Sequence, residues 1–249
     1  MVKAVIFDLD NTLYNYDAVN EQAIEAVGKW LCAEVQIAYE EFLKAFQKGR
    51  EQTKKALRNC AAQHNRIIYF QKASEYLGLN PVKYSLELYD VYWGYMLKCM
   101  CPEPGVWELL QRLNRSGVKV AVCTDLTAHI QHRKLRELGI ADFVDVFVSS
   151  EEAGAEKPDR RIFDMTIHKL GMPPSEMIYV GDSYEKDVIG ASDAGIRPVW
   201  FNPYGRLRKG REVKKTLEIT RMEELERHIY MEEDIWKKTR YGRRKCCDF

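Results

Sequence analysis

The sequence predicts an α/β fold in which a Rossmann-like parallel sheet forms the core and an all-helical domain is inserted into it. Three observations support this prediction. Residues 1–13 contain one short apolar strand, and residues 17–100 then show helical periodicity without a convincing strand. From Val106 onward, β-branched strands alternate with helices that end at glycine, as in repeated βα units.

The inserted domain contains segments whose apolar residues recur at three- and four-residue spacing, which is typical of amphipathic helices. These segments are Glu21–Glu34, Tyr39–Arg58, Ile67–Leu77 and Val82–Met100. The stretch Gly78–Pro81 predicts the end of one helix and the start of the next, and Pro102–Gly105 predicts a rigid link back to the core. We therefore expect residues 14–104 to form a separate helical domain.

The α/β core is expected to comprise residues 1–13 and 105–230. After the first strand, its predicted strands are Val118–Cys123, Phe143–Val148, Met177–Val180, Pro198–Phe201 and a short last strand at Leu217–Thr220. Its predicted helices are Val106–Arg115, Ala128–Leu138, Arg160–Leu170, Glu185–Ala194 and Met222–Ile229. Repeated units of this length imply a parallel sheet with helices on both faces.

Charge and composition argue against several classes of protein. The 249 residues include 38 basic and 37 acidic side chains, so the net charge of +1 gives no global field that would attract nucleic acid or an acidic membrane. No apolar stretch reaches the roughly 18 residues that a membrane span needs, and the N-terminus is unlike a signal peptide. The 7 cysteines form no C-x-x-C pair, which favours reduced thiols. We therefore expect a cytoplasmic protein.

Residues 231–249 form a basic C-terminal tail. Such a run is usually a solvated helix end or a frayed terminus. A weak contact with nucleic acid or an anionic surface is the alternative. The sequence leaves the oligomeric state open.

Polar side chains follow the predicted strands at the points where the strands end, and ligands of open parallel sheets bind just beyond those ends. These residues are Asp8 and Asp10, Thr124 and Asp125, Lys157, Asp182 and Asp187. Asp8 and Asp10 are two residues apart on an extended segment, so both carboxylates could aim at one point. Two close carboxylates repel each other unless a cation lies between them, and Mg²⁺ prefers such oxygen ligands.

Each of these residues also has a purely structural interpretation. Asp10 could cap the following helix, as Asp often does. Lys157 could be a surface lysine before a helix that starts at Pro158–Asp159. Asp187 could stabilise a helix N-terminus through the helix dipole, which is compatible with a functional role. The combination of groups at four strand ends favours a chemical site.

The order and spacing of four short motifs resemble the haloacid dehalogenase-like (HAD) hydrolase superfamily. The motifs are Asp8–Thr12, Thr124, Lys157 and Gly181–Asp187, and the helical insert resembles a C1-type cap. The resemblance implies that Asp8 is the nucleophile and Asp10 the general acid and base. It also implies that Thr124 and Lys157 hold phosphoryl oxygens. Mg²⁺ is expected to be bound by Asp8, the backbone carbonyl of Asp10, Asp182 and Asp187, the last directly or through water.

The expected activity is Mg²⁺-dependent hydrolysis of a small phosphate monoester, a nucleotide or a sugar phosphate, through an aspartyl-phosphate. The presence of Asp10 and of the acidic fourth motif favours phosphate chemistry over dehalogenation. Two alternatives remain open: a phosphomutase of the same fold, and a non-catalytic interaction or regulatory module. The expected partner is a small phosphorylated metabolite.

Substrate choice is expected to lie in the cap, which closes over such sites and excludes water. Tyr14 and Tyr16 directly follow the first motif and could line the crevice between cap and core. Arg66, in a loop-like stretch, could meet a second anionic or polar group, although a solvated basic residue near a helix start is an equal alternative. Asp125 departs from the Asn that is common after the second motif, and we treat it as a candidate specificity residue.

Overall fold

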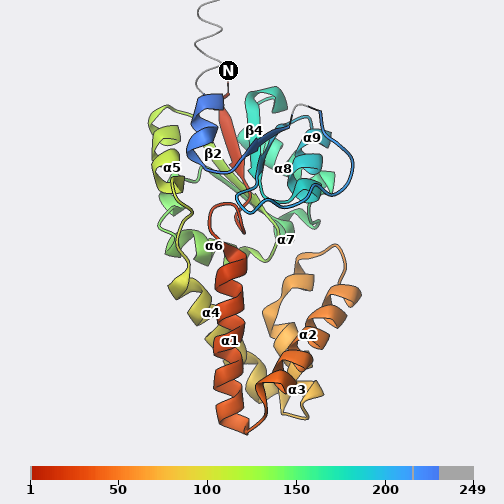
Figure 1. Cartoon of the computed structure of the whole chain (residues 1–249). Helices are drawn as coiled ribbons and strands as arrows, with labels where there is room; N and C mark the ends of the chain where they lie inside the picture. The colour runs from red at the N-terminus through yellow and green to blue at the C-terminus, as the bar shows by residue number, and fades with distance from the viewer. Residues whose placement is uncertain (1, 215, 230–249) are drawn as a thin grey trace, which may run out of the picture.

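The computed structural model describes residues 2–214 and 216–229, and within them the predicted parallel sheet is confirmed. Its strands follow the order β3-β2-β1-β4-β5-β6, and every pair of neighbours is parallel (Figure 1). The strands are β1 (Ala4–Phe7), β2 (Lys119–Thr124), β3 (Val146–Ser149), β4 (Met177–Gly181), β5 (Arg197–Phe201) and β6 (Leu217–Ile219). The first strand of the chain thus lies in the middle of the sheet.

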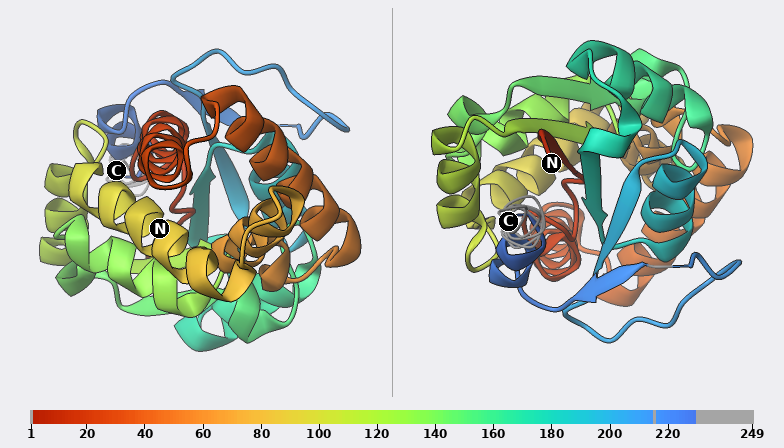
Figure 2. Two further views of the ribbon diagram at one scale, coloured as in Figure 1. Left: turned by 90° about the horizontal axis from the view of Figure 1, so that it is seen from below. Right: turned by 90° about the horizontal axis from the view of Figure 1, so that it is seen from above.

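Helices cover both faces of the sheet, as Figure 2 shows. Successive side chains of β1 point to opposite faces, so Val5 and Phe7 belong to one buried apolar cluster while Ala4 and Ile6 belong to another. The first cluster includes side chains of α5 (Val106–Arg115) and α6 (Ala128–Glu137), and the second includes those of α8 (Arg160–Leu170) and α9 (Gly190–Asp193). Burial on both faces explains why β1 is a continuous apolar run.

Between β1 and α5 the chain forms four long helices, which we call the helical insert. They are α1 (Tyr16–Val35), α2 (Tyr39–Ala56), α3 (Arg66–Tyr76) and α4 (Pro81–Cys99). Asparagine side chains cap three of them, because Asn15, Asn65 and Asn80 accept hydrogen bonds from backbone N–H groups of the first turn. The insert lies beyond the carboxyl ends of the strands (Figure 1).

The insert shares its apolar core with one face of the sheet. Phe42, Phe70 and Tyr92 are fully buried and belong to the same cluster as Phe7. Gly49 lets α2 approach α3 closely, since a Cβ atom there would lie 2.8 Å from a backbone oxygen of α3. The sheet and the insert are therefore packed together over the site-bearing end of the strands.

Several predicted boundaries differ from the structure. The strand expected from Phe143 begins at Val146, because Ala141–Phe143 forms a 3₁₀ turn. The helix expected at Glu185–Ala194 starts as a π-helical turn, Tyr184–Ile189, before α9. The short helix α7 (Ser150–Ala153) was not predicted, since four residues carry no measurable periodicity.

Residues 223–229 are helical, close to the predicted last helix. The basic tail, residues 231–249, lies outside the described residues.

Candidate active site

Lys157 lies between two other predicted site residues, Asp8 and Asp187, and forms an ion pair with each. Its Nζ lies 2.7 Å from a carboxylate oxygen of Asp8 and 2.7 Å from one of Asp187, and all three side chains are buried. Burial alone would lower the pKa of Lys157, but the charges of Asp187 and Asp8 outweigh it and raise that pKa well above its usual value. Lys157 is therefore a charged, buried group beside Asp8, and the alternative of a surface lysine is wrong.

Three carboxylates form a compact buried cluster, the acidic cluster, at the ends of β1 and β4. One oxygen from each of Asp8, Asp182 and Asp187 lies within 4.8 Å of the others. Burial and the neighbouring Asp187 raise the pKa of Asp182 to about 7, and burial is also the main cause that raises the pKa of Asp8. This mutual repulsion and the oxygen-only donor set fit a divalent cation such as Mg²⁺.

The local backbone holds Asp187 in this cluster. Its Oδ2 accepts a hydrogen bond of 2.9 Å from the backbone N–H of Ser183, one turn earlier. Its Oδ1 accepts bonds from Lys157 and from the hydroxyl of Tyr179. Any side chain at position 181 would collide with this carboxylate, so Gly181 makes the close approach possible. The π-helical turn at Tyr184–Ile189 thus carries a carboxylate of the acidic cluster, and such turns often occur at functional sites.

The carboxylate of Asp10 has different partners. It accepts hydrogen bonds from Lys134 Nζ at 2.6 and 2.9 Å and from the hydroxyl of Tyr14 at 2.6 Å. Burial would raise the pKa of Asp10, but Lys134 and then Tyr14 outweigh it and hold that pKa below its usual value. Lys134 is itself fully buried.

The expectation that Asp8 and Asp10 aim at one cation is therefore wrong for the side chains, because the carboxylate of Asp10 is not part of the acidic cluster. The reason lies in the backbone. Asn11 adopts a left-handed conformation with φ of 62°, and Leu13 N–H bonds to the carbonyl of Leu9, so the chain turns at Asp10 instead of remaining extended. A ligand role for the Asp10 carbonyl stays a prediction.

Thr124 and Asp125 follow β2 and are both held in place. The Thr124 hydroxyl accepts a bond of 2.8 Å from Gln131. One oxygen of Asp125 accepts the backbone N–H of Lys157 at 2.9 Å, and the other lies 2.7 Å from Lys186 Nζ. The negative charge of Asp125 is therefore paired, which reduces its repulsion of an anionic ligand.

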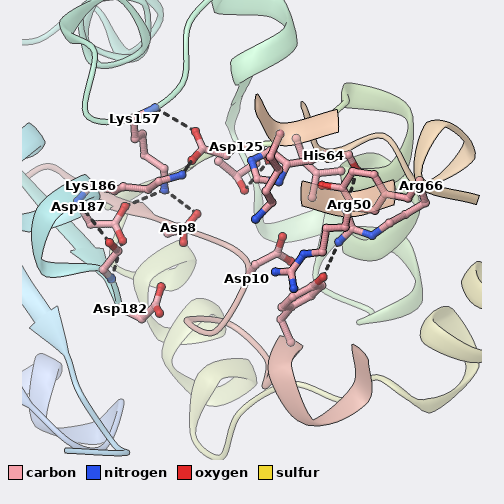
Figure 3. A pocket seen from close by; sticks show the side chains of 16 residues that line it. Asp8, Asp10, Arg50, His64, Arg66, Asp125, Lys157, Asp182, Lys186 and Asp187 are labelled. Atoms are coloured by element: carbon pink, nitrogen blue, oxygen red, sulfur yellow. Dashed lines mark hydrogen bonds and ion pairs between the residues drawn. The ribbon is translucent and has the colours of Figure 1, made fainter. Parts of the chain in front are cut away.

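Core and insert together line a cavity of about 190 Å³, and Asp8 and Asp10 are among the residues of its wall. Figure 3 shows Asp10 between the acidic cluster on one side and Arg50, His64 and Arg66 of the insert on the other. This volume lies below the roughly 300–1,000 Å³ of pockets for drug-sized ligands, so the cavity suits a small metabolite.

Two of the three predicted insert residues line this cavity, namely Tyr16 and Arg66. Tyr14 does not line it, because it is fully buried beneath Asp10. The alternative of a solvated Arg66 is wrong: the residue begins α3, only 6% of it is exposed, and it donates to the hydroxyls of Tyr16 and Tyr92.

The polar residues of the site that were not predicted include Gln131, Lys134, Lys186 and Arg206. Gln131 and Lys134 lie three apart on the buried face of α6, beside Ile130 and Leu135. Polar residues on an apolar helix face are a signal that could have identified them. Arg206 reaches Asp182 from the loop after β5, for which the sequence offers no signal.

Among the described residues, no helix is long and apolar enough to cross a membrane. The family model described as haloacid dehalogenase-like hydrolase matches residues 2–195. The chain is 39% identical over 206 residues to a ribulose-1,5-bisphosphate 5-phosphatase of Halopiger xanaduensis, covering 82% of this chain and 86% of the relative. It is 32% identical over 215 residues to a glyceraldehyde 3-phosphate phosphatase of Methanopyrus kandleri, covering 85% and 86%.

Among solved structures, a HAD phosphatase from Thermococcus onnurineus superposes with a TM-score of 0.69 at 27% identity, covering 92% of this chain and 98% of that one. The match thus extends over the sheet, the insert and the motifs at the strand ends. The chain belongs to the haloacid dehalogenase-like hydrolase family.

Proposed function

We propose that this hydrolase is a Mg²⁺-dependent phosphatase that removes the phosphoryl group of a small phosphorylated sugar through an aspartyl-phosphate on Asp8. One observation carries the proposal: Asp8 faces the cavity while Lys157 and two further carboxylates surround it. A buried carboxylate beside a lysine and a cation site can approach an anionic phosphoryl group that would otherwise repel it.

In the first half of the reaction, an oxygen of Asp8 attacks phosphorus and the bond from phosphorus to the leaving alkoxide breaks. Asp10 gives its proton to that alkoxide. In the second half, Asp10 takes a proton from a water molecule whose oxygen attacks phosphorus, and the bond from phosphorus to Asp8 breaks. Inorganic phosphate and free Asp8 result.

Asp10 must therefore exist in both protonation states. In the structure, Lys134 and Tyr14 favour the ionised form, which is the base that the second half needs. An incoming phosphate dianion raises the pKa of a nearby carboxyl group, which favours the acid needed in the first half.

Lys157 and Thr124 would hold phosphoryl oxygens, and Lys157 would neutralise charge as it shifts in the transition state. Mg²⁺, when bound by Asp8, Asp182 and Asp187 with the Asp10 carbonyl, would lower the repulsion between nucleophile and substrate. Asp125 would act through its neighbours, because it holds the backbone of Lys157 and the side chain of Lys186.

We further propose that residues 14–104 act as a cap over this site. Gln63 and His64 of the insert contact Glu156 of the core, with His64 Nε2 3.1 Å from the carboxylate. These contacts hold the insert against the core beside the cavity, which supports a role as a cap. The phosphosugar class is supported by the cavity volume and by phosphosugar phosphatases among the relatives, two of which are described above.

The test is release of inorganic phosphate from a panel of phosphorylated sugars and nucleoside monophosphates, with Mg²⁺ and with a chelator. We expect Mg²⁺-dependent release from sugar phosphates in preference to nucleotides. Faster release from nucleotides would overturn the substrate class. Accumulation of isomeric sugar phosphates without free phosphate would identify a mutase, and the absence of turnover with every ester would favour a binding module.

A further inference from the structure

At the end of the cavity that the helical insert lines, three cationic side chains lie within reach of a ligand. Arg50 and Lys54 are four residues apart on α2, Arg66 begins α3, and all three line the cavity that contains Asp8. Within residues 2–214 and 216–229, none of these three side chains forms an ion pair. We call them the distal cation cluster.

The acidic side chains of the same cavity already have cationic partners. Asp8 and Asp187 pair with Lys157, Asp10 pairs with Lys134, Asp125 pairs with Lys186, and Asp182 pairs with Arg206. The nearby Glu156 is bonded to Gln63 and His64. These carboxylates therefore lie nearer to other cations or to His64 than to the distal cation cluster, with which they form no ion pair.

Arg66 is the most deeply placed member. Only 6% of it is exposed, and its guanidinium donates to neutral oxygens: the hydroxyls of Tyr16 and Tyr92 and the carbonyl of His64. The rings of Tyr69 and Tyr92 lie 5.2 and 5.5 Å from its carbon Cζ, which holds the group in place by cation–π contact. A buried charge without a direct ion pair is costly, and an anionic ligand in contact with it relieves that cost.

Lys54 and Arg50 lie closer to solvent, with Lys54 half-buried and Arg50 exposed. Burial, followed by the charges of Arg50 and Arg66, lowers the pKa of Lys54 to about 8. The members of the cluster thus repel one another. An anion bound among them would remove this repulsion as well.

We propose that the distal cation cluster binds a second phosphate group of the substrate, at the opposite end from the phosphoryl group that Asp8 attacks. The inference rests on the proposed phosphatase activity and narrows its substrate to a bisphosphorylated metabolite of about sugar size. Three cations match the charge of a phosphate dianion better than they match the single charge of a carboxylate. The planar guanidinium of arginine can also donate two hydrogen bonds to phosphate oxygens. The cavity of about 190 Å³ suits a short carbon chain between the two phosphates.

The test compares kcat/KM for phosphate release from matched pairs: ribulose 1,5-bisphosphate and ribulose 5-phosphate, fructose 1,6-bisphosphate and fructose 6-phosphate, and the flexible butane-1,4-diol bisphosphate and butyl phosphate. The variant is Lys54→Gln, and its matched control is Lys55→Gln, which removes the same charge from the exposed neighbouring residue on α2. Arg66→Lys is a second variant that keeps the charge but loses the fork, and its fold is checked by thermal melting.

We expect the wild-type chain to prefer the bisphosphate in at least one pair by about 10- to 100-fold, the effect of a charge-assisted contact. Lys54→Gln should reduce this preference about tenfold, whereas Lys55→Gln should keep it. Equal rates within every pair, or an unchanged preference in Lys54→Gln, would overturn the inference while the phosphatase activity stands. A phosphate monoester that carries a distal carboxylate and matches the bisphosphate would also overturn it.

Failure of the proposed function has a different signature. In that case no ester is hydrolysed by the wild-type chain. Calorimetric binding of butane-1,4-diol bisphosphate, compared between the wild-type chain and Lys54→Gln, then decides the role of the cluster independently of turnover. About tenfold weaker binding by the variant supports the cluster, and equal binding overturns it.

Discussion

Lys134→Met tests how the proposed acid and base is positioned. Lys134 is fully buried, its Nζ makes two short contacts with Asp10, and it lies 5.4–5.6 Å from the ring centroids of Tyr14, Tyr16 and Trp93. Methionine preserves most of the apolar packing and removes only the charge and its hydrogen bonds. Asp10 then keeps only hydrogen bonds to neutral groups, from Tyr14 and Gln131.

Removing one partner of a buried ion pair costs about 3–5 kcal/mol. The side chain of Asp10 retains 21% exposure to the cavity, so we expect a loss in the free energy of unfolding near the lower limit, about 3 kcal/mol at pH 7. The pH dependence follows from the pKa of Asp10, which Lys134 holds below its unfolded value. The pair stabilises the fold fully above that unfolded value and loses this contribution as the pH falls through the lower folded value, so the penalty of the variant should shrink below about pH 4.

The assays are urea unfolding at pH 3 and 7 and the pH profile of kcat. Because loss of Lys134 raises the pKa of Asp10, the acid limb of the profile should move to higher pH. The exposed Arg136→Met, on the same helix, is the matched control and should change neither quantity. The double variant Asp10→Asn with Lys134→Met should recover stability relative to Lys134→Met alone. A Lys134→Met protein with unchanged stability and an unchanged profile would refute this reasoning.

Three further predictions concern neighbouring groups. In metal-free protein, Asp182 has a pKa of about 7, whereas the same carboxyl group in the unfolded chain ionises near pH 4. The folded state is therefore destabilised relative to the unfolded chain as the pH rises from about 4 to 7. In Asp182→Asn, thermal melts at several pH values should no longer show this loss of stability, which is at most roughly 4 kcal/mol. The same dependence of stability on pH in both proteins would contradict the prediction. Tyr14→Phe should cost about 1.5–3 kcal/mol of stability at pH 7 by urea unfolding, since a hydrogen bond to a charged group is lost, and a change below 0.5 kcal/mol would count against that bond. Lys157→Met should lower kcat by about 10²–10³-fold in steady-state assays, and near-native kcat would remove the lysine from the phosphoryl site.

The fold was predictable because its signals are local and repeated. In the βα units, β-branched residues indicate the strand and a glycine indicates the end of the helix. The bounds of the helix Arg160–Leu170 were predicted correctly at both ends. Parallel strands share one edge for their carboxyl ends, so the meeting of Asp8, Lys157, Asp182 and Asp187 followed from topology alone.

The features that the sequence could not predict depend on the course of the backbone and on tertiary contacts. The turn at Asn11 sends Asp10 away from Asp8, although a two-residue spacing on an extended chain would place them together. Lys134 and Asp10 are 124 positions apart in the sequence, and no local sequence pattern indicates that they form an ion pair. Arg66 resembled a loop residue because its burial depends on contacts with two other helices, through Tyr16 of α1 and Tyr92 of α4.

The measurement that tests the central claim most directly is chemical trapping of the acyl phosphate. The wild-type chain is quenched during turnover of a sugar phosphate with Mg²⁺, reduced with borohydride, digested and analysed by peptide mass spectrometry. Reduction converts an aspartyl-phosphate to homoserine, and we predict homoserine at position 8 alone. Asp8→Asn should fold normally, show no turnover and give no such peptide. Full phosphatase activity in Asp8→Asn, or homoserine at another position in the wild-type chain, would contradict the assignment of Asp8 as the nucleophile.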